Sequence, residues 1–228
     1  MTALTKLQFE YLQKIGMLLS TQLVLVFIVI IIVHKADPER ICIFTCDFWV
    51  DIILFLLLAF MLIYLSRINE NPAVRTLAFY GLGILMSFIL ALQYNIITME
   101  ARGNNKQVAK NFIMSVAIVI VITIAVVIAL PFTMQYMNFI YVMGSVLTIC
   151  LLGLIIWGFF VRKQFLIWVS ISLAVFLGLL ITDLTRLVYL CKKKGSVQCD
   201  AINGSTLLYV DLMNILQQIF ILTSRNNN

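Results

Sequence analysis

Residues 118–130 are IVIVITIAVVIAL, an unbroken apolar run in which most side chains are branched at Cβ. Such side chains favour β-strands in proteins that fold in water. In a lipid bilayer, however, backbone groups find no water to bond, and a helix satisfies all of them within one segment. The alternating pattern of a membrane β-barrel is absent from the sequence. The run therefore predicts a membrane-spanning helix and an all-α membrane protein.

The composition of the whole chain agrees with this prediction. Of the 228 residues, 63% are hydrophobic and 11% are charged, whereas soluble domains have about 45–50% apolar and about 25% charged residues. This excludes a soluble globular protein. Because one membrane helix needs about 20 residues, about seven helices would use nearly all of the hydrophobic residues. We expect a single polytopic membrane domain that covers residues 1–228.

Apolar runs separated by charged or turn-forming segments predict seven membrane spans. The spans are residues 16–33, 48–65, 76–99, 111–130, 138–161, 164–190 and 206–223. Pro131 is expected to end the fourth span. The last span is the least apolar, because Asp211 and three amide side chains interrupt it. It enters the membrane only if protein or water shelters its polar face, either as a span inside the bundle or as a re-entrant hairpin.

The sequence leaves the orientation in the membrane open. With seven spans, Lys and Arg residues divide seven against eight between the two sides, so the positive-inside rule gives no direction. The tripeptide Asn203-Gly204-Ser205 is an N-glycosylation sequon in the loop before the last span. It is functional only if that loop is lumenal, and otherwise it is an unmodified loop.

Four cysteines lie in two predicted loops, which hold Cys42 with Cys46 and Cys191 with Cys199. In a seven-span layout these loops face opposite sides of the membrane, so a disulfide between the loops is excluded. Free thiols are the expectation. A bridge within the second loop remains geometrically open.

Four ionisable residues lie within or near predicted spans: Asp51, Asp183, Arg186 and Asp211. Ionisable groups in lipid are costly, and they usually mark an ion pathway or a buried pair. Asp51 is at the start of a span, where the interface or the dipole of the helix N-terminus explains its presence. The two later aspartates are the stronger candidates for a functional site.

Asp183 lies in the last third of the sixth span, and Asp211 lies in the first third of the seventh. Because antiparallel neighbours joined by a hairpin place these segments side by side, we expect the two carboxylates at similar depth. Asn214 and Gln218 extend a polar stripe from Asp211 along one helix face. The alternative is that Asp183 pairs with Arg186 three residues later, while Asp211 only bonds across helices.

Two carboxylates at hydrogen-bonding distance cannot both ionise at low cost, so they titrate as a unit. Their hard oxygen atoms also suit Ca²⁺, with carbonyls and waters completing the coordination shell. A paired Asp183 and Asp211 therefore predict a site for which protons and Ca²⁺ compete. One such site could serve both gating and ion passage.

The segments GLLITDLTRLV (178–188) and LLYVDLMNIL (207–216) resemble the paired motifs of the transmembrane Bax inhibitor motif family, also called the Bax inhibitor or lifeguard family. The Leu-Tyr-x-Asp-x-x-Asn element at 208–214 is the most specific part of this match. Arg67 and the Asn71-Pro72 pair follow the second span in the family's order. The resemblance covers essentially the whole chain.

The resemblance implies a seven-helix fold with the last helix at its centre. It also implies that Asp183 and Asp211 form a pH-sensitive pair that serves a Ca²⁺ leak. Arg67 is the nearest match for a basic residue that latches onto this pair in a closed state, and an interfacial positive charge is the other explanation for it. Family members reside in the endoplasmic reticulum, the Golgi and related membranes, and several suppress cell death. The implied function is a Ca²⁺ leak channel linked to suppression of apoptosis, with no cofactor.

The chain departs from the family pattern at four positions. Thr182 stands where the family commonly has Tyr, and Arg186 stands where an uncharged residue is usual. Gln217 and Gln218 replace apolar residues after the second motif. These departures indicate a divergent member of a family that also has bacterial and viral versions.

Two other classes of function compete with a channel. The first is a membrane protein that affects cell-death or stress signalling by binding partner proteins, without conducting ions. The second is a seven-helix enzyme or receptor. A zinc-dependent membrane hydrolase needs several His, and His34 is the only one; a retinal protein needs a Lys in its last span, and 206–223 contains none. We therefore predict a protein that is not an enzyme and has no nucleic-acid partner.

Overall fold

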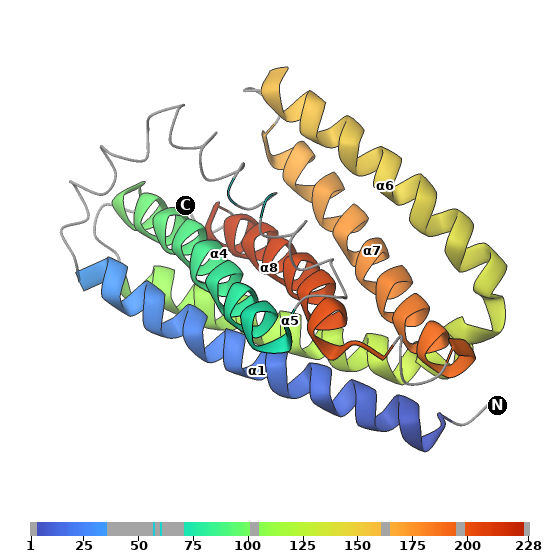
Figure 1. Cartoon of the computed structure of the whole chain (residues 1–228). Coiled ribbons are helices and arrows are strands. Elements are labelled where there is room, and N and C mark those ends of the chain that lie inside the picture. Colours follow the sequence, from blue (N-terminus) through green and yellow to red (C-terminus); the bar gives the residue numbers. More distant parts are fainter. Residues whose placement is uncertain are drawn as a thin grey trace. The chain divides into compact units, whose positions relative to one another are not determined.

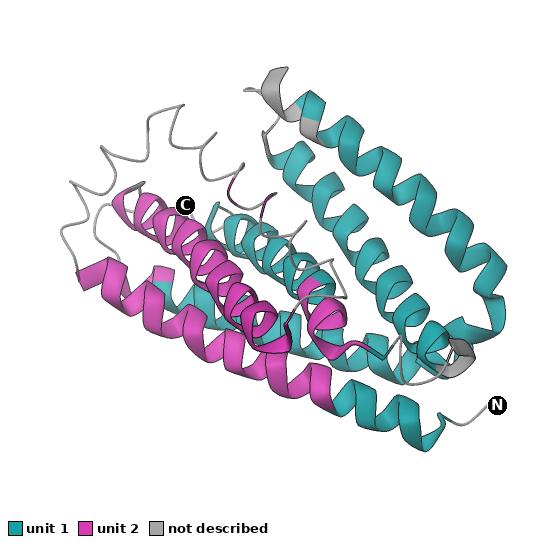
Figure 2. Cartoon of the chain, in the orientation of Figure 1, with its two compact units in different colours: residues 1–13, 109–199, 207–228 teal, residues 14–108, 200–206 magenta. Residues whose placement is uncertain are grey.

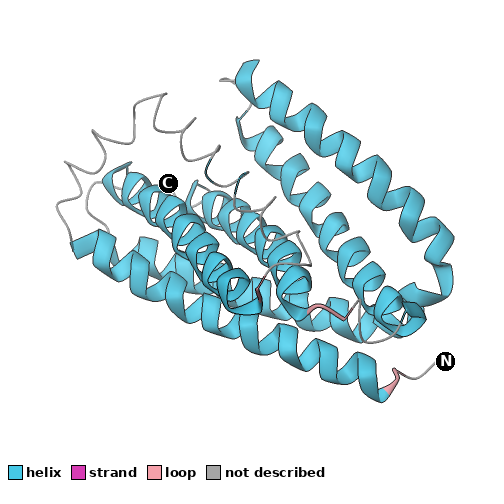
Figure 3. Ribbon diagram, viewed as in Figure 1, coloured by secondary structure: helices cyan, strands magenta, loops and turns pink. Residues whose placement is uncertain are grey.

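The computed structural model describes residues 4–35, 57, 60, 71–100, 105–160, 165–194 and 199–225. The regular secondary structure of this part of the chain is helical (Figure 3). The elements are α1 (Lys6–Lys35), α4 (Pro72–Glu100), α5 (Asn105–Thr133), the 3₁₀ turn η1 (Met134–Tyr136), α6 (Met137–Phe160), α7 (Phe165–Lys194) and α8 (Ala201–Arg225). The prediction of an all-α protein is confirmed for these residues.

The β-branched run at 118–130 lies within α5. Its side chains Val121, Ile124 and Ile128 are 65%, 55% and 74% exposed, and such an uncovered apolar face is what a helix in contact with lipid needs. The helix continues through Pro131 to Thr133, so the prediction that this proline ends the helix is wrong. Proline removes a single N–H donor and crowds the preceding turn, and the break in the helix follows one turn later, at η1.

Within the described residues, five helical stretches are long and apolar enough to cross a membrane. They are α1, α4, the joined stretch Asn105–Leu154, α7 and α8. The joined stretch has 50 residues, and at about 1.5 Å per residue it is far longer than one crossing of a bilayer core. Because the chain changes direction at η1 (Figure 1), α5 and α6 account for two of the predicted spans. The predicted span 48–65 lies outside the described residues except for 57 and 60, so the count of seven stays a prediction.

The chain divides into two compact units, which Figure 2 colours separately: residues 1–13, 109–199 and 207–228 form unit 1, and residues 14–108 and 200–206 form unit 2. Polar side chains join the helices of unit 1. The Gln8 amide donates to the carbonyl of Val188 at 3.0 Å, and the hydroxyls of Thr133 and Thr185 are 2.8 Å apart. The rings of Phe112 and Phe220 pack edge to face.

In unit 2, hydrogen bonds of polar side chains likewise join α1 and α4. The buried Gln22 amide donates to the carbonyl of Phe79 at 2.8 Å, and His34 Nδ1 lies 3.0 Å from Asn95 Oδ1. Interhelical hydrogen bonds of this kind hold membrane helices together, since burial of apolar side chains gives little driving force in lipid.

Helix α8 is the most buried of the candidate spans. Protein covers 61% of its most apolar window, against 22% for α1. A helix that carries Asp211 and several amides can lie at membrane depth only if protein or water shelters it. Its central position in a seven-helix bundle stays a prediction.

A disulfide joins Cys191, near the end of α7, to Cys199, just before α8. The expectation of free thiols is therefore wrong for this pair. Cys150, on which the sequence made no prediction, is an exposed free thiol on α6. Cys42 and Cys46 lie outside the described residues. The Cα atoms of Cys191 and Cys199 lie 4.9 Å apart, a proximity that spacing alone does not reveal.

The start of α8 also corrects the prediction that the glycosylation sequon lies in a loop. Asn203 and Ser205 are in the first turns of the helix, and Ser205 is fully buried. Asp200 caps this helix, because its Oδ1 accepts hydrogen bonds from the backbone N–H groups of Ile202 and Asn203 at 3.1 and 3.3 Å.

Candidate functional site

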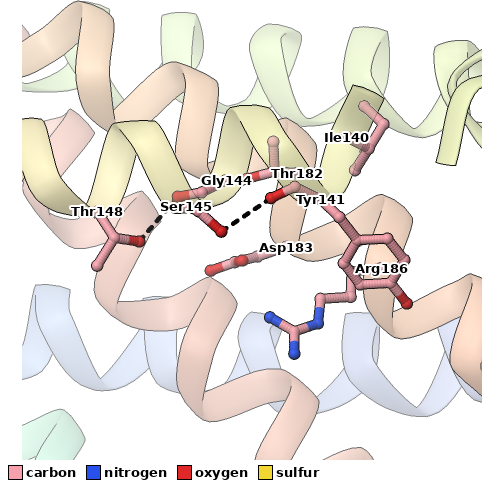
Figure 4. A pocket seen from close by; sticks show the side chains of 8 residues that line it. All are labelled: Ile140, Tyr141, Gly144, Ser145, Thr148, Thr182, Asp183 and Arg186. Carbon is pink, nitrogen blue, oxygen red and sulfur yellow. Dashed lines mark hydrogen bonds between the residues drawn. The ribbon is translucent and has the colours of Figure 1, made fainter. Parts of the chain in front are cut away.

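A pocket of about 200 Å³ opens between α6 and α7 in unit 1 (Figure 4). The residues that line it are Ile140, Tyr141, Gly144, Ser145 and Thr148 from α6, and Thr182, Asp183 and Arg186 from α7. The helices approach closely here because small residues lie between them: a Cβ on Gly144 would be 3.6 Å from Thr182. The pocket places the predicted residues Asp183 and Arg186 on one wall.

The serine and threonine hydroxyl groups of this pocket donate their hydrogens within their own helices. Ser145 donates to the carbonyl of Tyr141 at 3.0 Å and Thr148 donates to that of Gly144 at 2.9 Å (Figure 4). Thr182 donates to the carbonyl of Leu179 at 3.0 Å. A hydroxyl group that already donates its hydrogen can still accept through its oxygen lone pairs. The oxygens of these side chains can therefore accept hydrogen bonds from a ligand in the pocket.

Arg186 stacks on an aromatic ring beside this pocket. Its guanidinium carbon lies 5.5 Å from the centroid of the Tyr141 ring, which is cation–π range. No ion pair joins Arg186 to Asp183 among the described residues, although the arginine's charge acts on that carboxyl. The alternative that the sequence left open, an ion pair between Asp183 and Arg186, is therefore absent from the described residues.

Asp211 is on α8 and is 6% exposed. Its Oδ2 atom is buried and accepts no hydrogen bond from the part of the chain that the structure describes. Asp183 is near enough for its charge to act on Asp211, but no hydrogen bond between the two carboxyls is present among the described residues. The pairing of the two carboxyls therefore stays a prediction.

Part of the predicted polar stripe on α8 forms hydrogen bonds within its own helix. The Asn214 side-chain nitrogen donates to the carbonyl of Val210 at 2.8 Å. Gln218 is 3% exposed, and its Oε1 has no partner in the described residues. Asp211 and Gln218 lie seven residues apart, so they share a helix face. Two unbonded oxygens therefore lie on one side of the most buried helix.

Arg67, the predicted latch, and Asp51 lie outside the described residues. The buried cation that the structure describes is Arg75, whose Nη2 is 2.5 Å from Asp200 Oδ2 in unit 2. Arg75 lies just before the predicted span 76–99, and the sequence analysis gave it no role. Its partner is 125 positions away, and a pairing over that distance leaves no pattern in the sequence.

The described residues contain no group of three or more His, Cys, Asp or Glu side chains that could hold a metal ion. A resident metal centre is therefore not assembled from this part of the chain.

Comparison with known proteins gives one family. The family model described as "Inhibitor of apoptosis-promoting Bax1" matches residues 8–228. No curated protein and no solved structure gives a significant match. The matched range includes α7 and α8 with both aspartate motifs. This chain therefore belongs to the family of inhibitors of apoptosis-promoting Bax1, non-enzymatic integral membrane proteins that cross the bilayer several times and are linked to the regulation of apoptosis.

Proposed function

We propose that this chain forms a pH-sensitive, Ca²⁺-permeable leak channel in an intracellular membrane such as the endoplasmic reticulum or the Golgi, and that the leak serves suppression of apoptosis. Asp183 and Asp211 bind the passing cation and the proton, and Asn214 and Gln218 extend the polar face of α8. The observation that carries the proposal is the buried Oδ2 of Asp211, which has no hydrogen-bond donor among the described residues.

A buried carboxylate with an unbonded oxygen is costly at membrane depth unless a proton, a cation or water meets it. The nearby charge of Asp183 adds repulsion when both groups are ionised. Either a proton or a Ca²⁺ ion relieves that repulsion, so the two ligands compete for one site. The unbonded Gln218 Oε1 on the same face supplies a further oxygen ligand.

The test is Ca²⁺ flux into liposomes that contain the purified protein, measured between about pH 6 and 8. We expect the flux to vary with pH in the wild type. Because Ca²⁺ and protons compete, raising the Ca²⁺ concentration should move the midpoint of this variation to lower pH. Asp183→Asn and Asp211→Asn should each remove the pH dependence.

The matched control is Glu10→Gln, the same change of carboxyl to amide on α1, where Glu10 makes only an exposed pair with Lys6. This variant should keep the wild-type pH profile. A complete lack of flux from correctly folded wild-type protein at every pH would contradict the channel.

A second function is favoured by one observation, the positive charge of Arg186 beside Asp183. A permanent cation at the mouth of a cation pathway opposes conduction, and a protein that acts by binding cell-death regulators needs no pathway. This alternative predicts that Asp183→Asn leaves cell protection intact. Protection lost in Asp183→Asn, while every partner is still bound, would exclude it.

A further inference from the structure

Two opposite charges face the pocket between α6 and α7 without closing on each other. Asp183 and Arg186 both line it, and no ion pair joins them among the described residues. Three residues apart on a helix, their backbones differ in height by about 4.5 Å. A ligand that carries both a negative and a positive group could meet both side chains at once.

The pocket also has a marked excess of hydrogen-bond acceptors. The hydroxyls of Ser145, Thr148 and Thr182 all donate to carbonyls of their own helices, and the Asp183 carboxylate accepts when ionised. Only Arg186 brings several N–H donors to the rim. Such a lining suits a ligand with N–H donors at one end and anionic oxygens at the other.

The pocket is open on the side where α6 and α7 carry exposed apolar residues. Ser145, Thr148 and Arg186 are exposed, and Val142 and Ile149 beside them on α6 are 64% and 69% exposed. On membrane helices these apolar faces contact lipid. Arg186 is five residues before Cys191, the end of its candidate span, so the guanidinium is within reach of the headgroup layer. A molecule of the bilayer itself has access to this pocket.

We propose that the pocket binds the headgroup of phosphatidylethanolamine from the surrounding bilayer. Arg186, held on the Tyr141 ring, takes the phosphate. The primary ammonium lies against Asp183 and the hydroxyl oxygens of Ser145 and Thr182. The short two-carbon linker between phosphate and ammonium suits two side chains whose backbones are about 4.5 Å apart in height. The site needs no ion conduction by the protein, but it shares Asp183 with the proposed ion pathway, so an ammonium and a passing cation exclude each other at that carboxylate.

The choice of lipid follows from the charges and donors of the pocket. When both are ionised, Asp183 and Arg186 together carry no net charge. An anionic headgroup such as that of phosphatidylglycerol brings no cation to Asp183, so the carboxylate stays without a counter-charge from the lipid. Phosphatidylcholine carries the same charges as phosphatidylethanolamine, but its quaternary ammonium has no N–H to donate to the hydroxyl oxygens. We therefore expect affinity to fall in the order phosphatidylethanolamine, phosphatidylcholine, phosphatidylglycerol.

The experiment is native mass spectrometry of the delipidated full chain in detergent, titrated with each of these three lipids. In the wild type we expect the stated order. Arg186→Gln should weaken phosphatidylethanolamine binding by about tenfold or more, since it removes a charge-assisted contact. Ser145→Ala should reduce the preference for phosphatidylethanolamine over phosphatidylcholine.

Ser170→Ala is the matched control, because Ser170 on α7 is also exposed and donates to the carbonyl four residues earlier, but it does not line the pocket. It should bind like the wild type, and thermal melting should show all variants folded. Soluble phosphoethanolamine and inorganic phosphate are added as competitors. If either competitor displaced the lipid at equal concentration, the proposal that the pocket holds a bilayer lipid would be wrong. Equal binding of all three lipids, or a preference for phosphatidylglycerol, would overturn the site.

Discussion

Gly83 on α4 is the residue at which a single methyl group should matter most in unit 2. A Cβ at this position would overlap the side-chain amide of Gln22. That amide is fully buried and donates to the Phe79 carbonyl, so moving it aside breaks a buried hydrogen bond. Gly83→Ala should therefore cost about 1–3 kcal/mol of stability, seen as a lower melting temperature in detergent.

Gly16→Ala on α1 is the control for this substitution. Nothing lies within 4 Å of a Cβ at Gly16, and alanine favours the helix over glycine by about 1 kcal/mol. This variant should melt at or above the wild-type temperature. Equal melting of the two variants would mean that the Gln22 side chain is not fixed.

The ion pair between Arg75 and Asp200 is much less exposed than the pair between Lys6 and Glu10. The Arg75 side chain is 6% exposed and that of Asp200 is 16% exposed, so neither partner can turn fully into water. Arg75→Gln should cost about 3–5 kcal/mol, because it leaves a largely buried carboxylate without its counter-charge. The expected observation is a large fall in melting temperature.

Lys6→Gln provides the comparison, because Lys6 pairs with Glu10 at 4.0 Å with both side chains exposed. Exposed pairs contribute about 0–1 kcal/mol, so this variant should melt close to the wild type. If Arg75→Gln changed the melting temperature as little as Lys6→Gln, the ion pair would not stabilise the fold.

At the scale of elements, the connection from α7 to α8 is fixed by a covalent bond. The Cys191–Cys199 disulfide closes a short loop, for which the restricted unfolded chain gives about 2–3 kcal/mol of stabilisation. Cys191→Ser should lower the melting temperature, and reductant should have no further effect on this variant. Cys150→Ser, which removes a free exposed thiol, should change neither the melting temperature nor the sensitivity to reductant.

The sequence predicts which segments form helices, but it does not predict the residues at which some of them begin and end. The apolar runs place α4, α5, α6 and α7 closely, because apolar length is what the bilayer demands. α1, however, begins at Lys6 rather than at 16, since a helix continues into polar sequence where protein or interface covers it. α8 begins at Ala201 rather than at 206, because Asp200 caps it.

The candidate site could be predicted only in part, for a similar reason. Asp183 and Asp211 stand out because an ionisable residue in an apolar run is rare. Ser145 and Thr148 do not stand out, since serine and threonine are ordinary in membrane helices and bond their own backbone. The partnership of Arg75 with Asp200 depends on helix packing, which no local pattern encodes.

At the scale of the whole molecule, the disulfide predicts the orientation that charge counting leaves open. Disulfides persist in oxidising compartments and are rare facing the cytosol, so the junction of α7 and α8 should face the lumen or the cell exterior. In sealed microsomes, a membrane-impermeant maleimide should label Cys191 and Cys199 only after reduction and permeabilisation. Labelling in intact microsomes after reduction would place this junction on the cytosolic side.

The double role of Asp200 makes two structural events inseparable. One carboxylate oxygen holds Arg75, and the other caps the amides of Ile202 and Asn203. Departure of the guanidinium would therefore loosen the first turn of α8, and hydrogen exchange at those two amides would quicken in step. Asn203 is also the acceptor residue of the sequon, whose Ser205 is buried while that turn is formed. A glycan at Asn203 would then be a lasting mark of molecules in which this turn had not closed when the glycosylating enzyme met the chain.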